Sequence, residues 1–106
     1  MLDDGRLYND KDQVAVIISP NYGAGWYTWN PDYPDCLFDK DIAAALLNKD
    51  LYAAIDIAST KYPDCYSGGL EDAVVVWIDI GTKFKVIAYD GYETLQIYDS
   101  NSYLTA

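Results

Sequence analysis

Four segments of the chain have the apolar pattern of β-strands. The run from Val14 to Ile18 is β-branched and ends at a Ser-Pro-Asn turn, as a buried strand does. The run from Ala73 to Ile78 is apolar on both faces, which is typical of a strand that is covered on each side or lies at an interface. Residues 83–88 largely alternate between polar and apolar positions, and residues 92–98 form the expected return strand. Between these two lies Asp90-Gly91, the strongest hairpin signal in the chain.

Two short helices are predicted between the first strand and the later ones. Asp39 is the expected N-cap of the first, because acids and an alanine-rich run follow it. Asp50 is the expected N-cap of the second. That helix ends at Tyr62-Pro63, because the residue before a proline is pushed out of helical geometry. One apolar face of the second helix is formed by Leu51, Ile55, Ala58 and Tyr62.

The order of these elements predicts an α+β fold in a single domain over residues 1–106. The expected architecture is an antiparallel sheet, made of the N-terminal strand and a C-terminal three-stranded meander, with two helices packed on one face. A chain of 106 residues, 51% of them hydrophobic, is long enough to bury one core without metal or disulfide cross-links.

The longest stretch without a regular pattern runs from Pro20 to Asp35. It contains three prolines, two glycines and two of the three tryptophans. The glycines permit sharp turns and close backbone approach, and the aromatic residues offer large, stiff contact surfaces. One interpretation is that these rings cover the core, and the other is that they bind a partner. The predicted binding residues are Tyr22, Gly23, Gly25, Trp26, Tyr27, Trp29, Asp32, Tyr33 and Asp35.

The charge of the chain restricts its partners. Seventeen acidic residues against seven basic ones give a formal net charge of −10. This charge repels nucleic acids and anionic membranes, so we expect neither as a direct partner. A basic protein surface is the natural complement, although acidity also keeps a tyrosine-rich surface soluble.

The residue types argue against common catalytic and metal chemistry. Because the chain has no histidine, it lacks the commonest general base and the commonest metal ligand. We therefore expect no enzyme activity, no catalytic residue, no metal site and no cofactor. The acids Asp32, Asp35, Asp39 and Asp41 are expected to form a solvated rim. With no signal-peptide pattern and with apolar runs too short to span a bilayer, we expect a cytoplasmic protein.

The tetrapeptide Tyr-Pro-Asp-Cys occurs twice, at residues 33–36 and 62–65. If the two helices are antiparallel, both copies lie at the same end of the pair. A disulfide between Cys36 and Cys65, or a shared metal, would then be geometrically feasible. A chance repeat of an ordinary Pro-Asp turn is the stronger interpretation, and cytoplasmic thiols usually stay free.

Two stretches carry a resemblance to a known group of proteins. They are a Gly-Ala-Gly-Trp loop at residues 22–30 and a Gly-Thr-Lys-Phe hairpin at residues 81–93. In both, the chain resembles small, uncharacterised bacteriophage accessory proteins, and the likeness covers Val14 to Ile97. The resemblance implies a phage gene expressed in the cytoplasm of an infected bacterium. By analogy with other small acidic phage proteins, it also implies a binder or inhibitor of host defence or nucleic-acid enzymes.

Three functions are compatible with these patterns. The first is a binding protein that occludes a basic surface of a host protein, with its carboxylates imitating phosphates and its aromatic residues as anchors. The second is a small-ligand-binding protein in which Gly23 and Gly25 admit a flat ring. The third is a self-associating structural protein, a homodimer formed through the run from Ala73 to Ile78.

Overall fold

The computed structural model describes residues 5–20, 25–30, 32–89, 92–98 and 104–106. The described residues form five strands, two α-helices and three short 3₁₀ helices, labelled η. In chain order, these elements are β1 (Gln13–Ile18), η1 (Tyr27–Trp29), η2 (Pro34–Leu37), α1 (Lys40–Leu47), α2 (Leu51–Lys61), η3 (Gly68–Asp72), β2 (Val74–Asp79), β3 (Lys83–Tyr89), β4 (Tyr92–Tyr98) and β5 (Leu104–Thr105).

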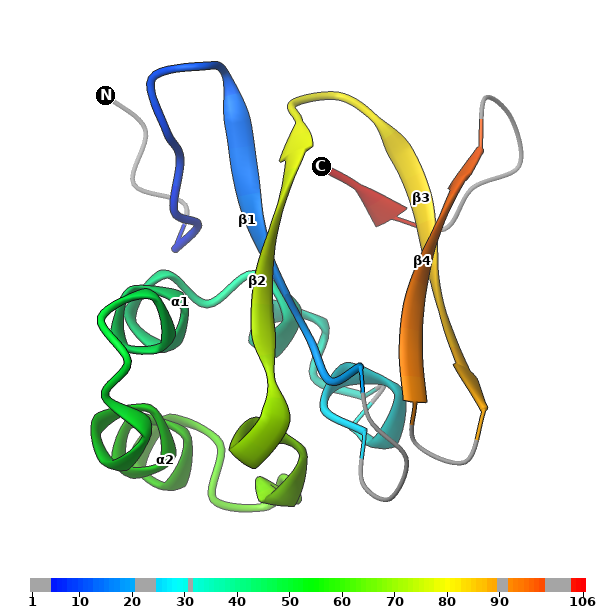
Figure 1. Ribbon diagram of the computed structural model, residues 1–106. Helices are drawn as coiled ribbons and strands as arrows, with labels where there is room; N and C mark the ends of the chain where they lie inside the picture. The colour runs from blue at the N-terminus through cyan, green and yellow to red at the C-terminus, as the bar shows by residue number, and fades with distance from the viewer. Residues whose placement is uncertain (1–4, 21–24, 31, 90–91, 99–103) are drawn as a thin grey trace.

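The elements are arranged in three layers (Figure 1). A two-stranded antiparallel sheet, β1-β2, forms the middle layer, with Gln13 opposite Asp79 and Ile18 opposite Val74. The helices α1 and α2 lie on one side of it, and a three-stranded sheet of order β4-β3-β5 lies on the other. This arrangement confirms the predicted α+β fold.

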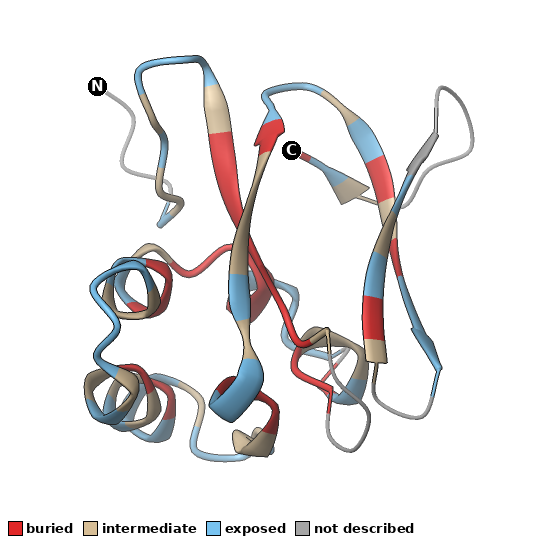
Figure 2. Cartoon of the chain, in the orientation of Figure 1, coloured by how far each residue is buried: buried red, intermediate tan, exposed pale blue. Residues whose placement is uncertain are grey.

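The middle layer has a core on each face because β1 is apolar at every position from Val14 to Ile18. Val14, Val16 and Ile18 pack against residues of the β4-β3-β5 sheet, including Phe84. Ala15 and Ile17 point the other way and pack against both helices. All five are buried, as the red stretch of β1 in Figure 2 shows. The alternation of side chains along a strand thus divides one apolar run between two cores.

The expected meander is divided between the two sheets. Its first strand, β2, pairs with β1, whereas its second, β3, pairs with β4 and β5. The chain crosses between the layers at Gly81, whose φ of +88° favours glycine. The strand that is buried on both faces is therefore β1. In β2, by contrast, only Ile78 is buried, so the chain itself does not cover this strand on both faces, and the alternative of an interface remains a prediction.

The β3-β4 pairing agrees with the predicted hairpin. Tyr89 lies opposite Tyr92 and Lys83 opposite Tyr98, so the two strands flank a two-residue connection. That connection, Asp90-Gly91, lies outside the described residues.

Both helices begin at the predicted N-caps. Asp39 accepts hydrogen bonds from the backbone N–H groups of Asp41 and Ile42, and Asp50 accepts one from Ala53. The last residue of α2 is Lys61 and its C-cap is Tyr62, so the helix ends before the proline as predicted. Within the residues that the structure describes, no helix has the length and apolar character that crossing a bilayer requires.

The segment between β1 and α1 is more regular than expected, because it contains η1 and η2. Pro34 is the first residue of η2, and its fixed φ suits the first turn of a helix, where its missing N–H costs nothing. Residues 21–24 and 31 of this segment are outside the described part, which resumes after β1 at Gly25.

Candidate functional site

A buried carboxylate fixes the start of the aromatic loop. Glu93, at the beginning of β4, is fully buried. Its Oε1 accepts a hydrogen bond from the Ser19 backbone N–H at 2.8 Å. Its Oε2 accepts from the backbone N–H of Trp26 at 3.0 Å and from that of Thr28 at 2.8 Å, and also from the Thr28 hydroxyl at 2.7 Å. Because four donors converge on one carboxylate, these hydrogen bonds attach the loop to the β4-β3-β5 sheet.

Two glycines let the backbone pack closely beside this carboxylate. A Cβ on Gly25 would lie 2.5 Å from Thr28 Oγ1 and 2.9 Å from Trp29 Cδ1. A Cβ on Gly69, in η3, would lie 2.5 Å from the carbonyl carbon and oxygen of Gly25. Since Thr28, Trp29 and η3 fill the space around Gly25, that glycine serves close packing. The small-ligand interpretation instead required Gly25 to leave space for a flat ring.

Trp26 belongs to the core. Its side chain is fully buried, and its Nε1–H donates to the Cys36 carbonyl at 2.9 Å. Its ring meets that of Tyr62 edge-on, at a centroid distance of 6.5 Å. Tyr27 is half-buried and packs against both cores, and burial raises the pKa of its phenol. Of the two interpretations of the loop rings, the one in which they cover the core describes Trp26, whose ring offers no exposed surface.

Asn30 connects the loop to the segment after α2. Its Nδ2 donates to the carbonyls of Trp26 at 2.8 Å and Tyr66 at 2.9 Å, and its Oδ1 accepts from the Tyr66 N–H at 2.9 Å. The Asn30 carbonyl also accepts from the Tyr33 N–H at 3.1 Å. Asn30 itself is buried, so these bonds hold the backbones of Tyr33 and Tyr66 in fixed positions around it.

Next to this buried network, the aromatic rings of Trp29 and Tyr66 form a pair that is exposed to solvent. The rings of Trp29 and Tyr66 lie 5.3 Å apart between centroids, with an interplanar angle of 34°. Their exposed fractions are 48% and 55%, although Asn30 holds the Tyr66 backbone and Trp29 lies between Thr28 and Asn30, which both belong to the buried network. Large aromatic residues usually bury their area, so a preorganised pair left open to solvent is a candidate contact site.

Carboxylates lie beside Tyr33, whose backbone N–H donates to the Asn30 carbonyl. The charge of Asp64 is the largest cause that raises the pKa of the Tyr33 phenol, and a hydrogen bond from the phenol to Asp64 and the charge of Asp32 act in the same direction. Tyr33, Asp32 and Asp64 are all exposed. We define the acidic aromatic surface as Trp29, Asp32, Tyr33, Asp64 and Tyr66.

Asp35 lies at a second cluster, next to the start of α1. It lines a hollow of about 220 Å³ together with Asp39, Lys61 and Tyr62. The buried Asp39 carboxylate accepts from the Tyr62 hydroxyl at 2.8 Å and from Lys61 Nζ at 3.2 Å. A hydrogen bond to Asp41 and the bond to Asp39 raise the pKa of Lys61, against the effect of burial. Because these groups join both helix ends, the cluster has a structural role.

The two Tyr-Pro-Asp-Cys copies lie together, as antiparallel helices require. Tyr33 of the first copy lies beside Asp64 of the second. Both Cys36 and Cys65 are free thiols. Burial is the largest cause that raises the pKa of the Cys36 thiol, which keeps it protonated and unreactive. Within the described part of the chain, no three His, Cys, Asp or Glu side chains are grouped to hold a metal.

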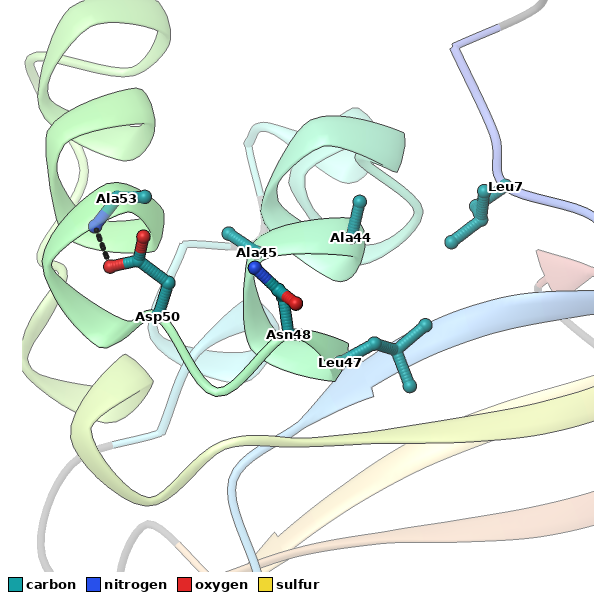
Figure 3. Close-up of a pocket in the computed structure, with 7 residues that line it drawn as sticks. All are labelled: Leu7, Ala44, Ala45, Leu47, Asn48, Asp50 and Ala53. Carbon is teal, nitrogen blue, oxygen red and sulfur yellow. Dashed lines mark hydrogen bonds between the residues drawn. The ribbon is translucent and has the colours of Figure 1, made fainter.

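An open hollow of about 600 Å³ lies beside the α1–α2 connection (Figure 3), and none of its lining residues belongs to the acidic aromatic surface. Its polar groups are few, and the Asp50 carboxylate among them is engaged with the Ala53 N–H. A site that orients a small ligand needs several converging polar groups. The lining residues are Leu7, Ala44, Ala45, Leu47, Asn48, Asp50 and Ala53.

The structure divides the predicted binding residues into distinct groups. Trp29, Asp32, Tyr33 and Asp35 are exposed, Tyr27 is half-buried, and Gly25 and Trp26 are buried. Tyr22 and Gly23 lie outside the described residues. The sequence patterns missed four residues, although the repeated tetrapeptide pointed to the segment that holds two of them. The missed residues are Asn30, Asp64, Tyr66 and Glu93.

Comparison with known proteins finds no matching family model, no matching curated protein and no matching solved structure. The site itself is therefore the basis for inferring a function.

Proposed function

We propose that this protein is a non-catalytic binding protein whose acidic aromatic surface covers a basic surface of another protein. The observation that carries the proposal is the exposed ring pair of Trp29 and Tyr66. Through Asn30 this pair is connected to Tyr33, beside which Asp32 and Asp64 lie. The net charge of −10 also favours a basic partner over the molecule as a whole.

The chemistry of this surface suits arginine and lysine side chains. A guanidinium or ammonium group stacks on the face of an aromatic ring, and tryptophan is the best such ring. Carboxylates such as Asp32 and Asp64 add charge-assisted hydrogen bonds, which a guanidinium makes in pairs. The network of Asn30 and Glu93 supports this role, because a surface already held in place loses less entropy when it binds.

The resemblance to phage proteins extends the proposal. The partner would be a host defence or nucleic-acid-handling protein in an infected bacterium, and its inhibition would follow from occlusion of the basic surface that it uses. Carboxylates that occupy sites for phosphates act as competitors for nucleic acid.

The test is an NMR titration of the ¹⁵N-labelled protein with a short peptide in which arginine alternates with glycine. We expect the Trp29 indole N–H and the backbone signals of Tyr33 and Tyr66 to shift. The Trp26 indole N–H, which is bonded to Cys36 inside the core, should stay in place. Peptides of the same length with lysine or glutamate in place of arginine are the controls.

Shifts that decrease in the order arginine, lysine and glutamate, and that weaken as salt is added, support the proposal. Shifts confined to other surfaces, or equal shifts with the glutamate peptide, would contradict it. A Trp29→Ala, Tyr66→Ala double variant should lose most of the response to the arginine peptide. The Tyr52→Ala variant, in which an exposed tyrosine of α2 is removed, should keep it.

A further inference from the structure

Among the described strands, β2 has one edge without a partner. It pairs with β1 on one side, and within the described residues no further strand extends this sheet. In Figure 1, β2 lies in front of β1, and no other element is drawn in front of it. Between Asp72 and Asp79 the strand carries no charge, and Val74 is 43% exposed. Natural edge strands usually carry charges or prolines that prevent pairing with another chain, and β2 has neither along this stretch.

The pairing on β1 identifies the backbone groups that face this open edge. The Ala15 N–H bonds to Leu7, and the Gln13 carbonyl accepts from Asn9, so odd-numbered residues of β1 face away from β2. Even-numbered residues of β1 therefore bond to β2, where their partners are Val74, Val76 and Ile78.

It follows that the N–H and C=O groups of Val75 and Trp77 point outward. Within the described part of the chain, no residue bonds to these four groups. At either side of them the edge is already occupied, since the Ala73 N–H donates to Leu70 and the Asp79 carbonyl accepts from Thr82. The open edge therefore consists of the backbone groups of Val75 and Trp77. Between them lies Val76, whose backbone groups bond to β1.

Such an edge is complementary to itself. When two copies pair antiparallel with Val76 opposite Val76 at the two-fold axis, Val75 of each copy lies opposite Trp77 of the other. Each of these two pairs exchanges two backbone hydrogen bonds, so all the outward groups are satisfied. The side chains of Val75 and Trp77 lie on the same face, where a β-branched residue opposite an aromatic one is a favourable cross-strand pair.

The charges at the ends of β2 select this register. With Val76 on the axis, Asp79 lies opposite Ala73, and Asp72 lies opposite Ile80. A shift that places Val75 on the axis would bring Asp79 opposite Glu71, and like charges directly opposite one another are unfavourable. A shift that places Trp77 on the axis would use the Asp79 carbonyl, which Thr82 already occupies.

We infer that β2 is a self-pairing edge through which two copies form a symmetric dimer with a continuous four-stranded sheet, β1-β2-β2-β1. This interface uses the strand edge, whereas the sequence pattern suggested the two faces of the same run. It lies on other elements than the acidic aromatic surface, so a dimer leaves the proposed partner site in place.

Sedimentation velocity over a range of protein concentrations tests the inference. We expect a concentration-dependent dimer that becomes tighter as sodium chloride is added, because salt screens the repulsion between two copies of charge −10. A monomer at every concentration, in low salt and in high salt, would overturn the inference.

Two variants test whether the dimer uses this edge. Val75→Pro removes an outward N–H and no bond to β1, and proline is tolerated on an edge strand in that position. Val74→Lys places a charge at an exposed position of β2. Each should weaken the dimer about tenfold or more, as expected for the loss of one or two hydrogen bonds or the burial of a charge. Ile87→Lys, on the exposed face of β3, is the control and should leave the dimer unchanged. If the dimer survives both β2 variants, it uses another surface and the inference is wrong.

Disulfide cross-linking tests the register. Residues opposite each other in a non-hydrogen-bonded pair have Cβ atoms about 4.5–5.5 Å apart, so Val76→Cys should cross-link to its symmetry mate under mild oxidation. Val74→Cys should not, because its mate lies four residues along the strand, about 13 Å away. Wild-type protein under the same conditions controls for Cys36 and Cys65. Cross-linking of Val74→Cys in preference to Val76→Cys would contradict the proposed register.

Discussion

The Glu93 carboxylate binds Thr28 twice, through the backbone N–H at 2.8 Å and the hydroxyl at 2.7 Å, across a sequence separation of 65 residues. With the bonds to Ser19 and Trp26, this contact attaches the aromatic loop to β4. The acidic aromatic surface therefore depends on a residue that contributes nothing to its exposed area.

Replacement of Glu93 should destabilise the protein, because every group around it is a donor. In Glu93→Gln, the amide NH₂ must face at least one N–H, which leaves a buried donor without an acceptor. We expect a loss of about 1–3 kcal/mol in the free energy of unfolding, measured by urea denaturation. The exposed Glu71 is the matched control, and Glu71→Gln should change stability by about 0.5 kcal/mol or less. Equal stability of the two variants would show that the Glu93 network does not hold the loop.

The two tryptophans of the loop should differ sharply in stability. Trp26→Ala empties a fully buried site and should cost about 3–5 kcal/mol, enough to unfold a marginal domain. Trp29→Ala removes a half-exposed ring and should cost about 1 kcal/mol or less. Thermal melts followed by near-ultraviolet circular dichroism measure both. If Trp29→Ala is as costly as Trp26→Ala, Trp29 is a core residue and the proposed site is wrong.

The close approach of η3 to the loop predicts a strong effect of one methyl group. Gly69→Ala would place its Cβ 2.5 Å from the Gly25 backbone, which must shift to make room. Overpacking of this kind should cost about 1–3 kcal/mol. The displaced loop should also weaken the response to the arginine peptide, because Gly25 adjoins the Glu93 network. An unchanged unfolding midpoint in urea would contradict the packing described for η3.

Stability should fall at alkaline pH through groups beside Asp39. Burial and the hydrogen bond to Asp39 raise the pKa of Tyr62 above its usual 10.0, and the pKa of Lys61 is raised above 10.5 by its hydrogen bonds to Asp41 and Asp39. The folded protein holds these protons more tightly than the unfolded chain. Their contribution is therefore complete below about pH 10 and is lost as the pH rises through the folded pKa values.

Tyr62→Phe isolates the tyrosine in this effect. At about pH 8 the variant should be less stable than the wild type by about 1 kcal/mol, because Asp39 loses a hydrogen bond. Between about pH 10 and 11.5 the difference should narrow, since the wild type loses the Tyr62 contribution and the variant has none to lose. Urea denaturation at each pH measures the difference. A constant gap across this range would show that Tyr62 has the same pKa in the folded and unfolded states.

The local features of the fold were predictable from sequence. The caps Asp39 and Asp50, the end of α2 before Pro63 and the β3-β4 pairing all depend on neighbouring residues, and the structure confirms them. The division into two sheets was not predicted, because an apolar run reads the same whether its faces meet helices or another sheet. The apolar side chains of β1 are divided between two cores, whereas the apolar run of β2 forms an edge strand of the two-stranded sheet.

The candidate site was predicted in part. The sequence located the loop, but it did not distinguish Trp26, which the core buries, from Trp29, which stays exposed. It also missed Glu93 and Tyr66, because they reach the loop through tertiary contacts across 65 and 36 residues. Neither spacing nor composition indicates such contacts.

Capture of partners from a bacterial lysate, followed by mass spectrometry, tests the central claim most directly. The tagged wild type, the Trp29→Ala, Tyr66→Ala double variant and the Tyr52→Ala control are compared at low and at high salt. We predict a basic protein that is captured by the wild type and the control at low salt, lost at high salt, and lost at both salts with the double variant. Equal capture of that protein by the double variant and the wild type would contradict the assignment of Trp29 and Tyr66 as the binding surface.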